Sequence, residues 1–351
     1  MKDFYRGKRI LVTGGTGSIG SEIVRQLLDF EPAVVRVFSR DETRQADLRQ
    51  SLGQRGDVRY LIGDVRDAVR LRRALSGIDF AFHAAAMKHV PACEYNPFEA
   101  VQTNVVGTQN LIQAALDAHV GRVIAISTDK AVDPVNTMGA TKLLAEKLIT
   151  TANYWAADTR FACVRFGNVL GSRGSVVPLI QKQIETGGPV TLTSISMTRF
   201  VMSIRQAVHL TLKAGTLAEG GEVFILRTPA VTVEDLVQVL IERHASRAHV
   251  DPSRVKVITT GPRPGEKLSE ALMTEEESLR TAVLPEMFVV YPPQSPRAEE
   301  LTEARQEAQR GRIARAAQPE AEVSPTDFRS DEVERTLSRA DIRRLLDEAG
   351  L

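Results

Sequence analysis

An acidic and a basic residue stand side by side in the stretch S-T-D-K, where Asp129 and Lys130 follow Ser127 and Thr128. An apolar run, 122–126, comes directly before this stretch and has the composition of a buried parallel strand. Open α/β sheets bind ligands beyond the carboxyl ends of their strands. If the backbone leaves the strand early, an acid and a base at this place can exchange protons with one substrate. The alternative is a solvated ion pair, which is what most neighbouring surface charges form.

A second lysine, Lys142, follows Met138 by four residues, and a helical pattern begins there. We expect this helix to run from Thr141 to Ala157. Pro134 favours an early turn after the strand. Together with a glycine motif near the N-terminus, these residues favour a ligand site over a solvated pair.

The glycine motif is T-G-G-T-G-S-I-G, in which Gly14, Gly17 and Gly20 follow a β-rich run, 9–13, and open an amphipathic helix. Glycines here allow a tight turn and a close approach of the backbone to a pyrophosphate, which the helix N-terminus faces. The motif in this context predicts a dinucleotide site. The other residues expected to contact the dinucleotide at the turn are Thr16, Ser18 and Ile19.

The end of the second predicted strand, 34–38, is where a dinucleotide's 2′ group is read. A hydroxyl and an arginine would hold a 2′-phosphate, whereas a carboxylate would bond a 2′-hydroxyl. Ser39 and Arg40 come first and Arg44 lies one helical turn further on, so NADP is favoured. Asp41 stands where an NAD-type carboxylate would, which keeps NAD open, and the alternative for Arg40 is a solvated surface arginine.

The third predicted strand, 58–62, is followed by Asp64 and Val65, which are candidates for contact with the adenine. Asp64 would either accept from the adenine amino group or cap the helix that starts near Asp67; the sequence leaves both open.

The fourth predicted strand, 80–82, ends in H-A-A-A. Ala84 and Ala86 are small enough for the backbone to lie against a cofactor. We interpret His83 as a packed, hydrogen-bonded residue rather than a catalyst. Beyond them, Lys88 and His89 lie on a loop from which they could reach a substrate, and Asn104, in a helix expected from Pro97 to Ala118, could support the active loop.

Five strand–helix alternations in the first 165 residues predict an α/β fold with a doubly wound parallel sheet, a Rossmann domain. From Gly167 the chain becomes polar and glycine-rich, as in a binding loop. Helices are expected over 204–217 and 233–241, with a late strand over 222–226 that returns to the first sheet. We therefore expect an NADP-binding domain over 1–167 plus about 200–227, and a smaller mixed α/β substrate domain over about 168–199 plus 228–351.

Within that second domain, G-P-R-P-G-E-K (261–267) is either a rigid loop for an anionic group or a solvent-exposed turn. Residues 295–320 are rich in Glu, Arg and Ala and predict an exposed helix or a mobile segment. The apolar spacing over 337–346 predicts a last helix that docks on the domain.

Composition fits a globular protein: 351 residues, of which 43% are hydrophobic and 25% charged. A net charge of +1 gives no electrostatic reason to expect nucleic acid or a membrane as partner. We see no signal peptide and no bilayer-spanning run, so we expect a cytoplasmic location. Cys93 and Cys163 are expected to be buried thiols. We find no metal-ligand cluster and no nucleophile–histidine pair.

The chain resembles the extended short-chain dehydrogenase/reductase family in its T-G-x-x-G-x-x-G turn and in a Ser-Thr strand end before a residue-x-x-x-Lys pair. More narrowly, S-T-D-K-A-V-D-P-V-N-T-M-G-A-T-K is similar to the UDP-N-acetylglucosamine 4,6-dehydratase group of bacterial polysaccharide biosynthesis. H-A-A-A-M-K-H-V-P-A-C-E-Y-N-P, V-R-F-G-N-V-L-G-S-R-G-S-V-V-P, M-T-R-F and G-P-R-P-G-E-K are similar too. The resemblance runs from about residue 8 to the end, and it is to the short soluble members rather than to those with a membrane-spanning N-terminal region.

The resemblance implies an NADP-dependent lyase. Hydride passes from C4 of the sugar to the nicotinamide while the 4-hydroxyl loses its proton. The 4-ketone acidifies the C5 hydrogen, the C6 hydroxyl leaves as water, and hydride returns to C6 and a proton to C5. Asp129 would protonate the departing oxygen, Lys130 would handle the C5 proton, and Thr128 would bond the 4-oxygen. Lys142 would hold the nicotinamide ribose. Met138 occupies the family's catalytic tyrosine position, and a thioether does not transfer protons usefully. The base must therefore come from elsewhere, with Lys130 as the candidate, and the outcome at C5 stays open.

The resemblance also implies a nucleotide-sugar site, with arginines on the diphosphate. Its expected residues are Lys88, His89, Asn168, Arg173, Arg199, Arg263 and Glu266. For Arg199 the alternative is a salt-bridged scaffold residue. Two other functions stay open: a nucleotide-sugar epimerase or 4-ketoreductase on the same fold, and an NADP-sensing regulator without activity. Related folds associate through the two helices expected over 97–118 and 141–157, so a homo-oligomer is expected.

Overall fold

The computed structural model describes residues 1–247, 251–262, 264–312, 328–333 and 336–351. The described chain forms two compact units. Unit 1 comprises 1–165, 208–227 and 273–312, and unit 2 comprises 166–207, 228–272 and the described residues from 328 onward.

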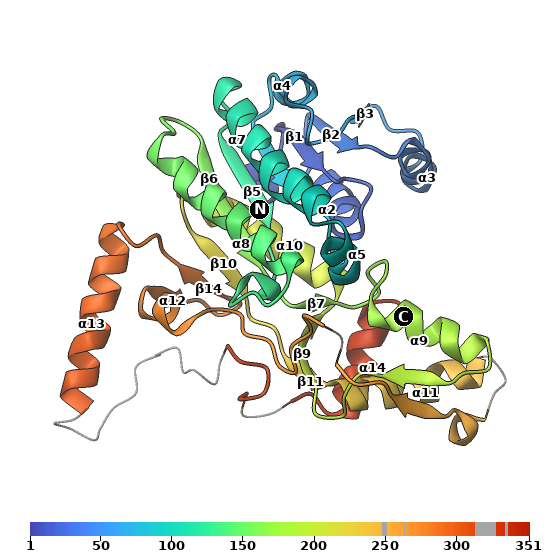
Figure 1. Cartoon of the computed structure of the whole chain (residues 1–351). Coiled ribbons are helices and arrows are strands. Elements are labelled where there is room, and N and C mark those ends of the chain that lie inside the picture. The colour runs from blue at the N-terminus through green and yellow to red at the C-terminus, as the bar shows by residue number, and fades with distance from the viewer. Residues whose placement is uncertain (248–250, 263, 313–327, 334–335) are drawn as a thin grey trace. The chain divides into compact units, whose positions relative to one another are not determined.

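A nine-stranded sheet forms the centre of unit 1 (Figure 1). Seven of its strands are parallel, in the order β3-β2-β1-β4-β5-β6-β10, as the alternation of apolar runs and helices predicts. The register pairs Thr13 with His83 and His83 with Ala125, so β1, β4 and β5 end near one another. The parallel strands are β1 (Arg9–Thr13), β2 (Val34–Ser39), β3 (Val58–Ile62), β4 (Phe80–His83), β5 (Arg122–Ile126), β6 (Arg160–Arg165) and β10 (Val223–Leu226).

The helices between these strands cover the sheet, and α7 and α8 lie side by side (Figure 1). Their buried residues are apolar at helical spacing; α2, for example, buries Ile23, Val24, Leu27 and Leu28. The helices are α1 (Lys2–Tyr5), α2 (Ser18–Leu28), α3 (Glu42–Leu52), α4 (Ala68–Leu75), α5 (Val90–Tyr95), α6 (Pro97–Val101), α7 (Gly107–Asp117) and α8 (Thr137–Thr151). Helix α10 (Ile204–Leu217) begins in unit 2 and continues in unit 1.

The helix expected from Pro97 to Ala118 is divided in three. A π-helical turn, Gln102–Val106, separates α6 from α7. Asn104 lies in this turn, which widens the helix by one residue and directs the buried Asn104 amide toward neighbouring backbone groups. The helix expected over 141–157 instead begins at Thr137, capped by the Asn136 side chain, and passes into the 3₁₀ turn Ala152–Tyr154.

The late strand β10 pairs in parallel with β6, as expected. Residues 273–312 also belong to unit 1, whereas the expected boundaries assigned them to the substrate domain. The reason is strand pairing: β14 (Met287–Val290) joins the sheet antiparallel to β10, and β13 (Thr281–Val283) pairs with β14. Helices α12 (Glu275–Leu279) and α13 (Pro296–Arg312) flank them, so a helix covers the described part of the 295–320 segment. Residues 200–207 belong to unit 2.

Unit 2 is a smaller α/β unit with its own apolar core, which includes Ile180, Leu240 and Leu346. Its strands form a three-stranded sheet, β11-β9-β7, and a two-stranded sheet, β12-β8. The last helix docks on this core as expected. The elements are β7 (Asn168–Val169), α9 (Val176–Glu185), β8 (Val190–Leu192), β9 (Thr198–Met202), β11 (Ala230–Thr232), α11 (Val233–Arg247), the 3₁₀ turn Pro252–Arg254, β12 (Val257–Thr259) and α14 (Arg339–Glu348).

Both cysteines are buried and unbonded, as expected. None of the helices within the described ranges is both long and apolar enough to cross a membrane.

Candidate active site

The glycine turn between β1 and α2 is packed so closely that side chains have no room. A Cβ on Gly14, whose φ is +64°, would lie 2.7 Å from the backbone of Ala84 and Ala85, and one on Gly20 would lie 2.2 Å from the Gly14 carbonyl oxygen. Gly17 caps α2 without a side chain, and no acidic residue lies in the first turn of that helix. The turn thus presents backbone and a positive helix end, which fits a pyrophosphate.

The residues after β2 are arranged around two exposed arginines. Arg40 pairs with Asp64 at 3.5 Å, and Arg44 pairs with Asp41 at 3.1 Å. Asp41 caps α3 by accepting from the Arg44 amide, so helix capping gives this residue a structural role. Ser39 is buried, and its hydroxyl accepts a bond from Gln45.

The residues after β3 settle one of the open alternatives. Asp64 does not cap the helix, because Asp67 is the N-cap of α4 and accepts from the Arg70 amide. Asp64 instead accepts three bonds from Arg66, at 2.7–3.0 Å. Burial alone would raise the pKa of Asp64, but the bonds and charge of Arg66 outweigh it and leave that pKa below its ordinary value. The buried Val65 packs against Gly107 at the start of α7.

His83 is buried at the end of β4 with a partner on each ring nitrogen. Its Nδ1 lies 2.7 Å from the Thr13 hydroxyl, and its Nε2 lies 3.1 Å from the Thr108 hydroxyl. Thr108 donates its own proton to the Asn104 carbonyl, so we assign the proton of the neutral ring to Nε2. Burial, and then the charge of Lys142, lower the pKa of His83 to about 3. The interpretation of His83 as a packed residue is confirmed.

Asn104 extends this network toward the loop that follows β4. Its side chain accepts from the Met87 amide at 2.8 Å and donates to the Met87 carbonyl at 3.0 Å. It also donates to the Thr141 hydroxyl on α8. The π-helical turn therefore holds both the loop and the helix in place. On that loop, Ala84 and Ala85 are half-buried, and Ala86, Lys88 and His89 are exposed.

Asp129 and Lys130 lie in a 3₁₀ turn, Asp129–Ala131, immediately after β5. The backbone leaves the strand here, as the early-turn argument requires. Asp129 is fully buried, and its Oδ1 accepts from the Thr128 hydroxyl at 2.8 Å and from Lys130 Nζ at 3.0 Å. Its Oδ2 is buried and has no hydrogen-bond partner within the described structure. The pair is therefore not a solvated surface contact.

The start of α8 packs directly against this turn. A Cβ on Gly139 would lie 2.2 Å from the Lys130 carbonyl oxygen. Lys142, one turn further along α8, donates to the carbonyl of Ile126 at the end of β5. Burial lowers the pKa of Lys142, although the nearby Glu146 carboxylate acts in the opposite direction.

Met138 is buried in an apolar cluster with Cys93 and Ala100. These contacts give Met138 a packing role.

The expected substrate residues of unit 2 have different surroundings. Asn168 is half-buried at the start of β7, and Arg173 is exposed in the following loop. Arg199 is buried, and its guanidinium donates to the carbonyls of Thr198, Lys267 and Leu268 at 2.7–3.0 Å. Its Nη2 lies 3.9 Å from Glu266. The scaffold alternative for Arg199 therefore agrees with these contacts better than a diphosphate ligand does. Arg263 lies outside the described residues.

The sequence did not single out three residues that lie on α8 or bond to it, namely Thr141, Glu146 and Arg165. A charge that ends the otherwise apolar strand R-F-A-C-V-R is the signal that could have found Arg165. Among the residues that the structure describes, no group of three or more His, Cys, Asp or Glu side chains is arranged to hold a metal ion.

The parallel sheet and the glycine turn place unit 1 in the class of Rossmann-like α/β folds. Residues 10–292 match the family described as Polysaccharide biosynthesis protein, and the chain belongs to that family.

Three curated relatives illustrate the range of named functions. An uncharacterized membrane protein of Methanocaldococcus jannaschii is 56% identical over 83% of this chain and 88% of its own length. A UDP-N-acetylglucosamine 4,6-dehydratase (inverting) of Campylobacter jejuni is 42% identical over 82% of this chain and 84% of its own. A UDP-glucose 4-epimerase of Rickettsia akari is also 42% identical, over 77% and 79%.

Two solved structures are similar along most of the chain. Pen from Bacillus thuringiensis superimposes with a TM-score of 0.85 at 42% identity and covers 98% of both chains. The dTDP-glucose 4,6-dehydratase DesIV of Streptomyces venezuelae, with NAD and TYD bound, has a TM-score of 0.64 at 25% identity and covers 87% of this chain and 98% of its own.

Proposed function

We propose that this protein is a nucleotide-sugar 4,6-dehydratase that converts an NDP-N-acetylhexosamine, UDP-N-acetylglucosamine in the first instance, to its 4-keto-6-deoxy product. The observation that carries the proposal is Asp129, a fully buried carboxyl group. One of its oxygens is bonded by Thr128 and Lys130, and the other has no hydrogen-bond partner among the described residues. Elimination of water needs an acid at the departing oxygen and a base at the carbon that loses its proton. A buried acid beside a lysine supplies both.

A nicotinamide dinucleotide fits the glycine turn, where an added Cβ would collide with backbone and the helix N-terminus carries no side-chain cap. When bound, it supplies the redox chemistry, oxidising the sugar at C4 and reducing it at C6. Lys142, at the start of α8 and beside the end of β5, would hold the nicotinamide ribose.

We assign each proton transfer to one of the protein's own residues. Thr128 binds the 4-oxygen, and Asp129 gives a proton to the departing C6 oxygen. Lys130 takes the C5 proton and returns a proton to C5 once C6 is reduced. The unpartnered Oδ2 of Asp129 is the position from which that proton is donated. Lys130 is also the candidate base for the 4-hydroxyl, since Met138 cannot serve. The proton taken there would pass to Asp129, 3.0 Å away, before Lys130 takes the C5 proton. The net change in the sugar is the loss of one water.

NADP is the proposed cofactor because two arginines, Arg40 and Arg44, lie after β2, and Asp41 is engaged as a helix cap. Both arginine side chains are more than half exposed, at 59% and 54%, so they can turn toward a 2′-phosphate. Comparing the Kd of NADP⁺ with that of NAD⁺ by fluorescence titration tests this choice, and tighter binding of NAD⁺ would reverse it.

The nucleotide end of the substrate is assigned to unit 2, with Asn168, Arg173 and Glu266 as the proposed contacts. Arg199 is proposed to act by holding the 266–268 backbone, to which it donates two of its bonds.

A second candidate function is a nucleotide-sugar 4-epimerase, which the Rickettsia relative favours. Epimerisation needs no acid at C6, so the buried Asp129–Lys130 pair favours the dehydratase.

The test is to incubate the purified protein with UDP-N-acetylglucosamine and NADP⁺ and to analyse the sugar by mass spectrometry and NMR. Loss of one water supports the dehydratase. A new isomer without a change in mass would establish the epimerase instead. An unchanged sugar, in a preparation that binds the dinucleotide, would refute the proposal for this substrate.

A further inference from the structure

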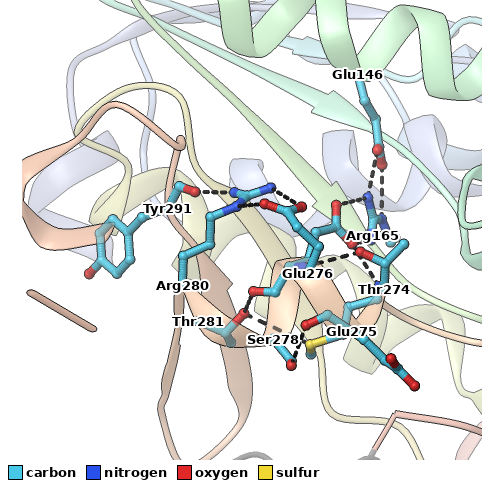
Figure 2. A network of polar contacts seen from close by, with 11 residues as sticks. Glu146, Arg165, Thr274, Glu275, Glu276, Ser278, Arg280, Thr281 and Tyr291 are labelled. Carbon is cyan, nitrogen blue, oxygen red and sulfur yellow. Dashed lines mark hydrogen bonds and ion pairs between the residues drawn. The ribbon is translucent and has the colours of Figure 1, made fainter. Parts of the chain in front are cut away.

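Unit 1 contains a buried group of three charged side chains that the proposed mechanism does not use. Arg165, the last residue of β6, has a side chain that is 1% exposed, and it lies between Glu146 on α8 and Glu277 on α12. Figure 2 shows Glu146 reaching the Arg165 guanidinium from α8. The two bonds of Glu146 measure 3.1 and 2.7 Å, and those of Glu277 measure 2.9 and 3.1 Å. Each carboxylate therefore binds the guanidinium through both of its oxygens, which is the most directional form of ion pair.

Two members of this group, Glu146 on α8 and Arg165 on β6, lie close along their elements to Lys142 and to its neighbour Cys163. Glu146 follows Lys142 by four residues on α8, which places the two on the same face of the helix, one turn apart. Cys163 precedes Arg165 by two residues on β6, so both point to the same side of the strand. Lys142 thus lies by Cys163, and Glu146 by Arg165.

The titratable groups around Lys142 come from three elements. They are His83 from β4, Cys163 from β6 and Glu146 from α8 itself. His83 is neutral, because its pKa is about 3. Burial raises the pKa of the Cys163 thiol, so it is protonated. Glu146 is the one of these three groups that an arginine binds, and Arg165 is its partner.

We propose that Arg165 is a positioning residue for Lys142. By binding Glu146 through two bonds, it fixes the part of α8 that carries the lysine and neutralises the carboxylate one turn away. Without Arg165, Glu146 would be a buried carboxylate whose neighbour along the helix face is Lys142, and the lysine would be drawn away from the Ile126 carbonyl toward it.

The test follows the titration of Lys142 in the full chain, with no cofactor or substrate present. Competitive labelling with acetic anhydride over a pH series, read by mass spectrometry of the peptide that holds Lys142, gives its apparent pKa. Arg165→Met should raise that value by about one unit or more, because it leaves an opposite charge nearby without a competing partner. Glu146→Gln should lower it, because the carboxylate that stabilises the charged lysine is removed.

The double variant is the decisive measurement. If Arg165 acts through Glu146, then Arg165→Met should have no further effect on Lys142 once Glu146→Gln is present. An equal upward shift in both backgrounds would show that Arg165 acts directly and would overturn the proposal. The matched control is Arg280→Met, which removes another buried arginine, paired with Glu276 rather than with Glu146 (Figure 2), and should leave the Lys142 titration unchanged.

Should Arg165→Met fail to fold, Glu146→Gln keeps the proposal testable, because it retains the Arg165–Glu277 bonds. An unchanged apparent pKa of Lys142 in that variant would refute the proposal. The importance of the pair for turnover rests on the proposed function, but the labelling does not. If the apparent pKa of Lys142 shifts as expected but the protein leaves the sugar unchanged, only the dehydratase proposal is refuted. If the protein converts the sugar but the apparent pKa of Lys142 does not change in the variants, only the positioning role is refuted.

Discussion

At the scale of single residues, the distinctive feature is a carboxyl group whose two oxygens have different surroundings. Oδ1 of Asp129 accepts two bonds, whereas Oδ2 is buried without a partner in the described structure. A buried polar atom without a partner is costly, and such atoms persist where they serve a ligand. We infer that a substrate hydroxyl completes the set.

Asp129→Asn and Lys130→Ala should each reduce kcat by about 10²–10⁴-fold, because each removes one positioned acid–base group. The Kd for NADP⁺ should stay within a few-fold of the original, since neither residue lies in the glycine turn. Steady-state kinetics with UDP-N-acetylglucosamine and a binding titration check the two statements. Asp133→Asn, an exposed carboxylate of the same loop, is the control and should retain activity. Near-normal turnover by either site variant would remove that residue from the mechanism.

His83 predicts a specific dependence of stability on pH. Its pKa is about 3 in the folded protein and about 6.5 when exposed. The unfolded state therefore binds more protons between these values, so the contribution of His83 to stability is complete above pH 6.5 and is lost as the pH falls toward 3. At about 1.4 kcal/mol per pH unit, lowering the pH from 7.5 to 5 should cost about 2 kcal/mol through this residue.

Urea unfolding of the wild type and of His83→Gln at both pH values measures this term. The wild type should lose about 2 kcal/mol more than the variant, in which the position does not titrate. Equal losses in the two proteins would mean that His83 is protonated without disrupting its bonds to Thr13 and Thr108.

At the scale of elements, the close contact between α8 and the 3₁₀ turn fixes where Asp129 and Lys130 lie. Alanine is ordinarily favoured over glycine inside a helix by about 1 kcal/mol. At Gly139 the sign should reverse, because the added carbon would stand 2.2 Å from the Lys130 carbonyl oxygen, a backbone atom that cannot move alone. Gly139→Ala should therefore lower both the midpoint of thermal unfolding and kcat. Ala140→Ser, at the exposed neighbouring position, should change neither, and a stabilised Gly139→Ala would contradict the described contact.

Many of the secondary-structure elements and their order could be predicted from the sequence. The parallel strands of unit 1, the order of strand–helix alternation and the turn at Gly14 follow from apolar runs and from glycine spacing, which are local signals. The π-helical turn at Gln102–Val106 could not be predicted, because it depends on bonds from Asn104 to Met87 and Thr141, which are distant in sequence. The same holds for β13 and β14, whose assignment to the first sheet depends on pairing with β10.

The candidate site was predictable to a similar degree. Asp129, Lys130 and Lys142 were identified from their place after a strand and at the start of a helix. The capping role of Asp41 was not identified, and a scaffold role for Arg199 was only the alternative, because the same residue types serve as ligands in other surroundings.

At the scale of the molecule, unit 1 exposes large apolar side chains on adjoining helices. Tyr95 and Phe98 are 88% and 84% exposed, and Leu144 on α8 is 52% exposed. Helices α5 and α6 both contact α8, so these residues occupy neighbouring elements. Exposed apolar groups gathered in this way favour an interface, and the expected homo-oligomer would use it.

Phe98→Asp should therefore lower the sedimenting mass of the protein toward that of a single chain in analytical ultracentrifugation. Val69→Asp, which charges an exposed apolar position on α4, should leave the mass unchanged. A wild-type protein that sediments as a single chain at micromolar concentration would exclude this interface.

The extra residue in the π-helical turn makes the register of the chain there unusually sensitive to length. Deleting one residue between Gln102 and Val106 would let α6 and α7 merge into a regular helix, which is the more stable local conformation. Every side chain on one side of the deletion would then be rotated by about 100° relative to the other, since a helix turns once in 3.6 residues. Asn104 could no longer face Met87 while Thr108 faced His83. Sequences that carry out the same chemistry on this scaffold should tolerate substitutions in this segment far better than a change in its length.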